Sequence, residues 1–183
     1  LIALCRHAEL RIVSDGKNHT FITYYIGRKS RELLLSIETL GRRYDLNGRK
    51  LMFFPTPYAH SPGSFITLDE RTGTLFTGDL FGSYSSQWEI FLELSEACYG
   101  CGDYRNCPEK RPYCPLPDLL EFNRTIMPSG KALRYAMDVV RALPVRRIAP
   151  QHGSILTREK DVAFVIERLA ALERVGIDAF TET

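Results

Sequence analysis

The sequence lacks the features that most quickly assign a chain to a class. No apolar run approaches the length of a membrane span, and no signal peptide is recognisable. Neither an internal repeat nor a low-complexity segment occurs, and there is no Gly-x-Gly-x-x-Gly phosphate loop or Gly-x-Ser-x-Gly nucleophile elbow. The adjacent pair His60 and Ser61 cannot easily share a hydrogen bond, so we discount it as a catalytic pair. The chemistry of the chain must therefore be carried by other residue types.

A charge excess of either sign is also missing. The 24 Lys and Arg residues nearly balance the 22 Asp and Glu residues, which leaves a formal charge of +2. We therefore expect no nucleic-acid partner and no membrane surface. With 183 residues, 44% of them hydrophobic and 25% charged, the chain has ordinary globular usage and is long enough for one domain, residues 1–183. We expect a cytoplasmic location.

Histidine is scarce as well, with four in the chain, and two of the four stand in conspicuous turns. His60 lies in a Pro- and Gly-containing turn, Asp79 follows the apolar run 74–77, and His152 follows the run 145–150 and precedes a glycine. Each of the three leaves a β-rich run and enters a turn that lets the backbone bend close to an ion. Imidazole and carboxylate suit zinc or iron, and a carboxylate can bridge two metals. The pattern predicts that His60, Asp79 and His152 are metal ligands.

These motifs resemble a known family. The stretches His-Ser-Pro-Gly-Ser (60–64), Leu-Phe-Thr-Gly-Asp-Leu-Phe-Gly (75–82) and Ala-Pro-Gln-His-Gly (149–153) look like the second half of a metallo-β-lactamase-fold domain. The Gly-Asp-Leu-Phe-Gly form and the spacing from His60 to Asp79 favour the flavodiiron proteins and the flavin-free oxygen-binding diiron proteins over the zinc hydrolases. The resemblance covers roughly residues 1–175. It implies an α/β (α+β) fold, an αββα sandwich of the metallo-β-lactamase type.

The resemblance also implies what is missing. The first ligand motif of the family, His-x-Glu-x-Asp-His, does not occur; His7 and Glu9 mimic its first half, but Arg11 and Ile12 stand where Asp and His would be. We interpret His7 as a surface residue and the chain as the C-terminal part of a domain that is incomplete at its N-terminus. In the family arrangement Asp79 would bridge two metals, His60 would bind one of them and His152 the other.

Three hypotheses for function follow. The first is a non-haem diiron domain that binds or reduces O2 or NO, as an oxidoreductase or an oxygen sensor, with an electron-donor protein as a partner because no flavodoxin-like part is present. The second is a zinc hydrolase of the same fold, in which two zincs replace two irons and activate a bridging hydroxide. The third is a module without catalysis that serves sensing or interaction. A homodimer is an expected assembly.

Cysteine is rare except in one segment. Four of the five cysteines, Cys98, Cys101, Cys107 and Cys114, have the spacing C-x2-C-x5-C-x6-C. They lie in a polar insert, residues 95–116, which has too few apolar residues to be ordered by packing alone. Either a zinc ion or an iron–sulfur cluster could supply the ordering energy. Disulfides, a redox dithiol and unconnected thiols are the alternatives, although a cytoplasmic location disfavours disulfides. Cys5 stands alone and is interpreted as a core thiol.

The local pattern predicts the elements that carry these residues. The end of a helix is expected at 1–5, and strands are expected over 10–14, 50–55, 64–69, 74–77 and 145–150. Asn47-Gly48 predicts a hairpin turn before the second of these strands. Helices are expected over 20–27, from 87 to 94, over 117–127, over 131–143 with Ser129 as its cap, and from Thr157 as a cap to Gly176. Trp88 and Phe91 are candidates for walls of the metal pocket.

Overall fold

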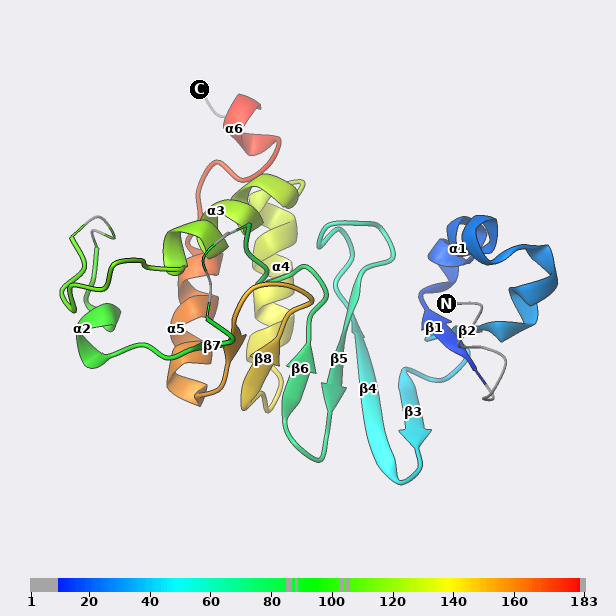
Figure 1. The fold of residues 1–183 in the computed structure, drawn as a ribbon. Coiled ribbons are helices and arrows are strands. Elements are labelled where there is room, and N and C mark those ends of the chain that lie inside the picture. The colour runs from blue at the N-terminus through cyan, green and yellow to red at the C-terminus, as the bar shows by residue number, and fades with distance from the viewer. Residues whose placement is uncertain (1–9, 85–86, 88, 103, 105, 182–183) are drawn as a thin grey trace.

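The computed structural model describes residues 10–84, 87, 89–102, 104 and 106–181 (Figure 1). The predictions for 1–5, Cys5, His7 and Trp88 lie outside these residues. The strands are β1 (Ile12–Ser14), β2 (Leu34–Ser36), β3 (Arg43–Leu46), β4 (Arg49–Pro55), β5 (Phe65–Asp69), β6 (Thr74–Phe76), β7 (Phe91–Leu92), β8 (Arg147–Ala149) and β9 (Ile155–Leu156). The α-helices are α1 (His19–Ile26), α2 (Glu96–Tyr99), α3 (Leu116–Ile126), α4 (Gly130–Arg141), α5 (Glu159–Ala170) and α6 (Asp178–Thr181), and the 3-10 helices are η2 (Gly16–Asn18) and η3 (Arg28–Leu33).

A seven-stranded sheet forms the centre of the molecule. Its strand order is β3-β4-β5-β6-β8-β9-β7, and β1 pairs with β2 in a separate two-stranded parallel sheet. Helices α3, α4 and α5 lie together over the β6–β8–β9 part of the large sheet, while β1, β2 and α1 lie beyond its β3 edge (Figure 1). The α/β class is confirmed, and one sheet layer with one helical layer matches half of the predicted αββα sandwich. No helix in the described ranges has the length and apolar content needed to cross a membrane.

The core lies between the large sheet and its helices. Leu75 on β6 and Ile148 on β8 are completely buried, and Leu133 on α4 and Val165 on α5 meet them from the helical side. Helix α4 follows its prediction closely, because the Ser129 hydroxyl accepts a hydrogen bond from the Ala132 N–H and caps the helix. Burial of this apolar stripe holds the helices to the sheet and makes the sheet a rigid base for the loops at its edge.

Several local predictions are confirmed. The β3–β4 hairpin turns at Asn47 and Gly48, which have φ values of 52° and 81°, as a primed hairpin turn requires. Strands β4, β5, β6 and β8 occur where expected, and α3 begins one residue before its predicted start. Helix α1 forms although its aromatic and β-branched residues favour a strand by propensity.

Two predicted helices are wrong in part. The segment 87–94 is not helical in its described residues, because exposed and buried side chains alternate from Phe91 to Leu94, and Phe91–Leu92 pairs as β7 with β9. Phe91 is therefore an edge-strand residue. The last helix begins after Arg158 rather than with a Thr157 cap, and it ends at Ala170. Gly176 instead allows a close approach, since a Cβ there would lie 2.1 Å from the Met127 carbonyl oxygen.

Candidate metal centre

The three predicted ligands follow three strands of the large sheet. His60 follows β4, Asp79 follows β6 and His152 follows β8. Strands β4 and β6 both pair antiparallel with β5 and so run in the same direction, and β8 pairs parallel with β6. Their carboxyl ends therefore lie at one edge of the sheet, where ligands commonly bind in α/β folds. This topology explains how residues far apart in the sequence meet.

The loop that carries His60 is closed by backbone and side-chain hydrogen bonds. The Thr56 N–H donates to the Ser64 carbonyl at 2.9 Å. On the other side, the Asn18 side-chain amide donates to the Gly63 carbonyl at 3.1 Å. A Cβ at Gly63 would lie 2.7 Å from that amide, so only glycine fits without displacing it. The loop is thus fixed both to its own strand and to η2.

The turn that carries Asp79 is held by two short-range bonds. The Thr77 hydroxyl donates to the Leu80 carbonyl at 2.5 Å, and the Gly82 N–H donates to the Asp79 carbonyl at 2.8 Å. Phe81 is buried in a left-handed conformation with φ of 69°, which is uncommon for an aromatic residue. The turn therefore buries the Phe81 ring beneath it while the Asp79 side chain stays 32% exposed.

Asn123 on α3 supports this turn from inside the protein. Its Oδ1 accepts from the Phe81 N–H at 3.2 Å, and its Nδ2 donates to the Gly82 carbonyl at 3.3 Å and to the Leu119 carbonyl at 2.8 Å. The residue has no exposed surface. Because buried backbone groups without partners are costly, this one amide makes the conformation of the Asp79 turn depend on α3.

His152 is oriented by its second ring nitrogen. Its Nδ1 lies 2.9 Å from the Ser83 carbonyl oxygen and 3.4 Å from the Ser83 N. In the tautomer with the proton on Nδ1, the carbonyl accepts that proton and Nε2 carries the lone pair that a metal would need. The ring packs edge-to-face on Phe122 at 4.8 Å between centroids, and Phe122 packs in the same way on Tyr84 at 4.6 Å. Together the hydrogen bond and the aromatic contact set the direction of the imidazole.

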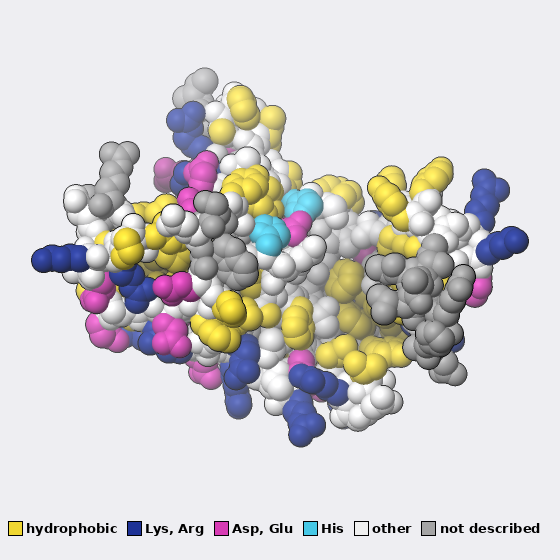
Figure 2. Space-filling model, in the orientation of Figure 1, with side chains coloured by type: hydrophobic (Ala, Val, Ile, Leu, Met, Phe, Trp, Pro, Cys, Tyr) yellow, Lys and Arg dark blue, Asp and Glu magenta, His cyan; other side chains and the backbone are white. Residues whose placement is uncertain are grey.

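The three side chains meet around one carboxylate. His60 Nε2 lies 2.7 Å from Asp79 Oδ2, and His152 Nε2 lies 3.6 Å from Asp79 Oδ1. Each carboxylate oxygen thus faces a different imidazole, and all three side chains are between 32% and 43% exposed. Figure 2 shows two histidine side chains beside an acidic one on the open surface of the molecule.

This donor set suits a dinuclear metal centre. A carboxylate that faces one imidazole on each side is the arrangement in which Asp can bridge two ions, with one His on each. The distance from His60 to Asp79 is that of a hydrogen bond, and the distance from His152 to Asp79 is that of an ion-pair contact. Among the described residues no group of three or more His, Cys, Asp or Glu side chains is arranged to hold an ion. The chemistry of the donors therefore fits such a centre, and the role of these three residues as ligands stays a prediction.

A polar hollow lies over His60 and Asp79. It has a volume of about 230 Å³, and Asn18, Thr77 and Gln151 line it together with the two predicted ligands. Sequence reasoning missed Asn18, because nothing in an exposed turn signals that its amide will reach Gly63. It also missed Asn123, although a polar residue amid the apolar face of a predicted helix was a usable signal.

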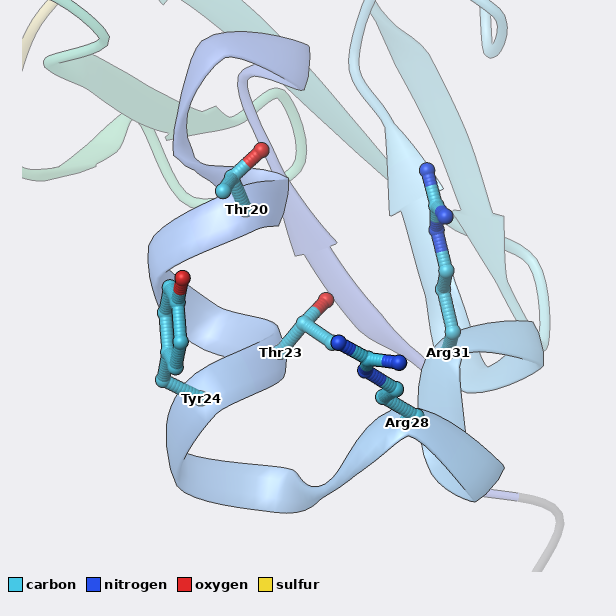
Figure 3. Close-up of a pocket in the computed structure, with 5 residues that line it drawn as sticks. All are labelled: Thr20, Thr23, Tyr24, Arg28 and Arg31. Atoms are coloured by element: carbon cyan, nitrogen blue, oxygen red, sulfur yellow. The ribbon is translucent and has the colours of Figure 1, made fainter.

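Two further hollows lie apart from these ligands. Figure 3 shows a pocket between α1 and η3 that offers hydroxyl groups and two guanidinium groups but no imidazole, thiol or carboxylate, so it does not suit a metal. The other is an apolar groove of about 420 Å³ beside the His60 loop. The pocket is lined by Thr20, Thr23, Tyr24, Arg28 and Arg31, and the groove by Pro57, Tyr58, Pro128, Ser129, Lys131, Ala132, Tyr135 and Ile177.

The four clustered cysteines lie away from this edge, between β7 and α3 (Figure 1). Cys98 is buried on α2, and Cys101, Cys107 and Cys114 are partly exposed. Burial raises the pKa of the Cys114 thiol above its ordinary value, and the nearness of the other three cysteines raises it further. The structure thus gathers the four in one region without setting any three as ligands of one ion.

Comparison with known proteins identifies the family of this chain and several related proteins. The family described as "ODP family beta lactamase" matches residues 2–153. The Type A flavoprotein fprA of Rhodobacter capsulatus is 33% identical over 118 residues, which are 64% of this chain and 23% of that protein. The anaerobic nitric oxide reductase flavorubredoxin of Aeromonas hydrophila is 27% identical over 146 residues, 74% of this chain and 25% of that protein.

A solved structure gives the same result. The apo state of the chemotaxis sensor ODP from T. denticola has a TM-score of 0.76 and 26% identity, and the match covers 99% of this chain and 67% of that one. The fold and the arrangement of strand ends define a protein of the metallo-β-lactamase fold, in its flavodiiron branch. The chain belongs to the ODP beta-lactamase family. It spans between 16% and 26% of the length of the curated relatives that it matches.

Proposed function

We propose that this chain forms part of a non-haem diiron centre that binds O2 or NO. In this proposal Asp79 bridges the two irons, His60 binds one of them and His152 the other. The observation that carries it is the position of the Asp79 carboxylate, whose two oxygens face two different imidazoles at 2.7 and 3.6 Å. A single mononuclear site would not need the carboxylate to present one oxygen to each side.

The residues around the ligands fit this role. The Ser83 carbonyl holds the Nδ1 proton of His152 and so keeps Nε2 as the coordinating atom. Asn123 fixes the turn of Asp79, and Phe122 shields one side of the His152 ring. When bound, the irons supply open coordination positions and electrons for a diatomic ligand. The protein would supply ligand orientation and a small hollow whose walls limit what can enter.

The descriptions of related proteins support iron as the metal and O2 or NO as the gas that it binds. One solved structure that matches 99% of this chain at 26% identity is described as a peroxy diiron species of the chemotaxis sensor ODP. The flavorubredoxin relative is described as a nitric oxide reductase. An oxidoreductase role would require an electron-donor protein, whereas a sensor would bind the gas without sustained turnover. Steady consumption of O2 or NO in the presence of a reductant would distinguish the two.

Iron loading of the natural full-length protein tests the proposal. Three side chains are fewer ligands than two irons need, and the family resemblance places the others in a His-x-Glu-x-Asp-His motif that this sequence lacks. We expect two irons for each chain after anaerobic loading with Fe²⁺, and a change in the visible spectrum on adding O2 or NO. His152→Ala and Asp79→Asn should remove at least one iron and most of the spectral change.

His19→Ala is the matched control, because His19 lies on α1 and is not among the three ligands. This variant should keep both irons and the gas-dependent spectrum. Preferential binding of two zincs with hydrolysis of an ester or phosphodiester would contradict the proposal in favour of the hydrolase. Full iron binding in Asp79→Asn would contradict the assignment of the bridging ligand.

A further inference from the structure

The segment that carries Cys98 and Cys101 is bound to α5 by several polar contacts. The Tyr99 hydroxyl donates to the buried Asp161 at 2.5 Å, and Arg168 Nη2 donates to the Cys101 carbonyl at 3.0 Å. The Tyr99 ring also packs edge-to-face on Phe164 at 5.2 Å. These contacts hold the segment that carries Cys98 and Cys101 against helix α5.

The backbone around the cysteines turns in the way that thiolate sites require. The Cys101 N–H donates to the Cys98 carbonyl at 3.1 Å, which closes the C-x2-C turn. The Leu116 N–H donates to the Cys114 sulfur, and such a bond favours the thiolate. A third turn closes at Cys107, whose carbonyl accepts from the Lys110 N–H at 2.9 Å. Each cysteine thus lies in a turn or at the start of a helix.

Packing gives this segment little other support. Between α2 and α3 the described residues form no helix or strand, and they are mostly Gly, Pro and charged or polar residues. Cys98 and Cys114 nevertheless contact the main core, one as a buried and the other as a partly buried member. Two sulfurs therefore approach the same core from either end of a segment in which, among the described residues, Tyr104 is the other side chain packed against that core. Metal coordination is the interaction that commonly orders such a segment.

We propose that Cys98, Cys101, Cys107 and Cys114 bind one zinc ion as a tetrathiolate site that has a structural role. On binding, the four thiols release their protons to solvent and the four sulfurs complete the coordination of the ion, so no open position remains for a substrate. Because Cys114 lies two residues before the start of α3, the ion would fix the start of the helix whose Phe122 and Asn123 support His152 and the Asp79 turn.

Zinc content of the full-length protein tests this inference separately from the diiron proposal. We expect one tightly bound zinc for each chain, which persists in the triple variant His60→Ala, Asp79→Asn, His152→Ala. Cys107→Ser and Cys114→Ser should each lose it, and Co²⁺ in place of zinc should show thiolate charge-transfer absorption that the two variants lack. Cys5→Ser is the matched control, because this cysteine lies outside the cluster, and it should keep the zinc.

Hydrogen exchange on the unmutated protein gives a test that does not depend on the folding of any variant. Removal of zinc by a chelator should speed exchange in residues 106–116 while α4 stays protected. Three results would overturn the inference: a stoichiometric zinc in Cys107→Ser, acid-labile sulfide with iron bound by the four cysteines, or a disulfide among them in protein isolated under reducing conditions. A chelator that leaves exchange of this segment unchanged would also overturn it.

Discussion

Gly82 lies in the Asp79 turn, beside the His152 ring. A Cβ at this position would lie 2.7 Å from His152 Cε1, 2.8 Å from the Asp79 carbonyl oxygen and 2.9 Å from Phe122 Cε1. These distances are too short for a methyl group. To make room for one, either the His152 ring would have to change its orientation or the Asp79 backbone would have to move. The absence of a side chain at one residue thus sets how closely two predicted ligands approach.

Gly82→Ala should therefore displace the His152 ring. We expect iron binding at least tenfold weaker, and a loss of about 1–3 kcal/mol in the free energy of unfolding, the usual cost of overpacking. Iron titration and chemical denaturation measure the two effects. Gly102→Ala, where a Cβ meets no atom within 4 Å, serves as the control. Equal iron affinity in both variants would show that the contact does not matter.

Asn123 is a second residue whose effect is indirect. Asn123→Leu keeps a similar volume but leaves the buried Phe81 N–H and the Gly82 carbonyl without this partner. Each unpaired buried group costs about 1–3 kcal/mol, so we expect lower stability and a turn that no longer holds Asp79 in place. Thr125→Ala, an exposed change on the same helix, should leave both stability and iron affinity nearly unchanged.

At the scale of the elements, strands β4 and β5 are joined by an ion pair between the half-exposed Arg49 and the buried Asp69. Arg49 Nε donates to Asp69 Oδ2 at 2.9 Å, and the Thr72 hydroxyl donates to the same oxygen at 2.6 Å. Hydrogen bonds from Arg49 and then Thr72 lower the pKa of Asp69 from 3.8 to about 2, although its burial acts in the opposite direction. The pair lies at the end of the hairpin opposite the His60 loop.

The sign of this shift predicts how stability changes with acid. A carboxyl whose pKa is lower in the folded state stabilises the fold above pH 4, and this stabilisation is lost as the pH falls from about 4 to about 2. Asp69→Asn should lose about 2 kcal/mol at neutral pH, in the range for a hydrogen bond to a charged group. Its stability should then fall less steeply between pH 4 and pH 2. Denaturation at several pH values tests this, with the exposed Asp138→Asn as the control.

A second buried carboxylate joins α5 to the cysteine-rich segment. Asp161 has no exposed surface and receives bonds from Tyr99 and from Arg158 Nε at 2.7 Å. Burial, and then the bond to Asp161, raises the pKa of Tyr99 to about 12, so its hydroxyl stays a donor at neutral pH. The contact between α5 and the cysteine-rich segment therefore depends on the Asp161 carboxylate.

Asp161→Asn should weaken this contact. The variant loses hydrogen bonds to a charged group, which contribute about 1.5–3 kcal/mol each, while the Arg158 charge, 45% exposed, can be solvated. We expect faster hydrogen exchange in α2 with little change in β4 or β5. Glu159→Gln, an exposed change two residues away on the same helix, should leave exchange in α2 as it was. Uniform loss of protection across the sheet would instead indicate global unfolding.

At the scale of the whole molecule, the three predicted metal ligands follow strands that are otherwise joined only through the sheet. An ion bound by the folded state at 100 times its dissociation constant adds about 2.7 kcal/mol to stability. For a chain of this size each kcal/mol corresponds to about 2–4 °C in Tm. Loading the full-length protein with Fe²⁺ should therefore raise Tm by about 5–10 °C. The rise should be absent in Asp79→Asn, and a rise of equal size in that variant would place the ion elsewhere.

Much of this architecture was predictable because its signals are local. The Asn47-Gly48 turn, the Ser129 cap and the apolar stripe of α4 each depend on residues within a few positions of one another. The failures have the opposite cause. Strand β7 forms because β9 offers it a partner, and the last helix ends at Ala170 because the following residues pack against the α3–α4 corner rather than extend the helix. Neither partner can be read from the segment itself.

The amino-acid sequence alone determined the fold class, the family branch and the three ligand candidates, because these rest on short motifs in which the type of residue carries the chemistry. Only the tertiary structure decided how the candidates face one another, with one Asp79 oxygen toward each imidazole. It also decided which residues support them, since Asn18, Ser83 and Asn123 act through contacts between distant segments. Such contacts exist only once the sheet and its helices have packed, and of the three residues only Asn123, a polar residue on an apolar helix face, gave a local signal.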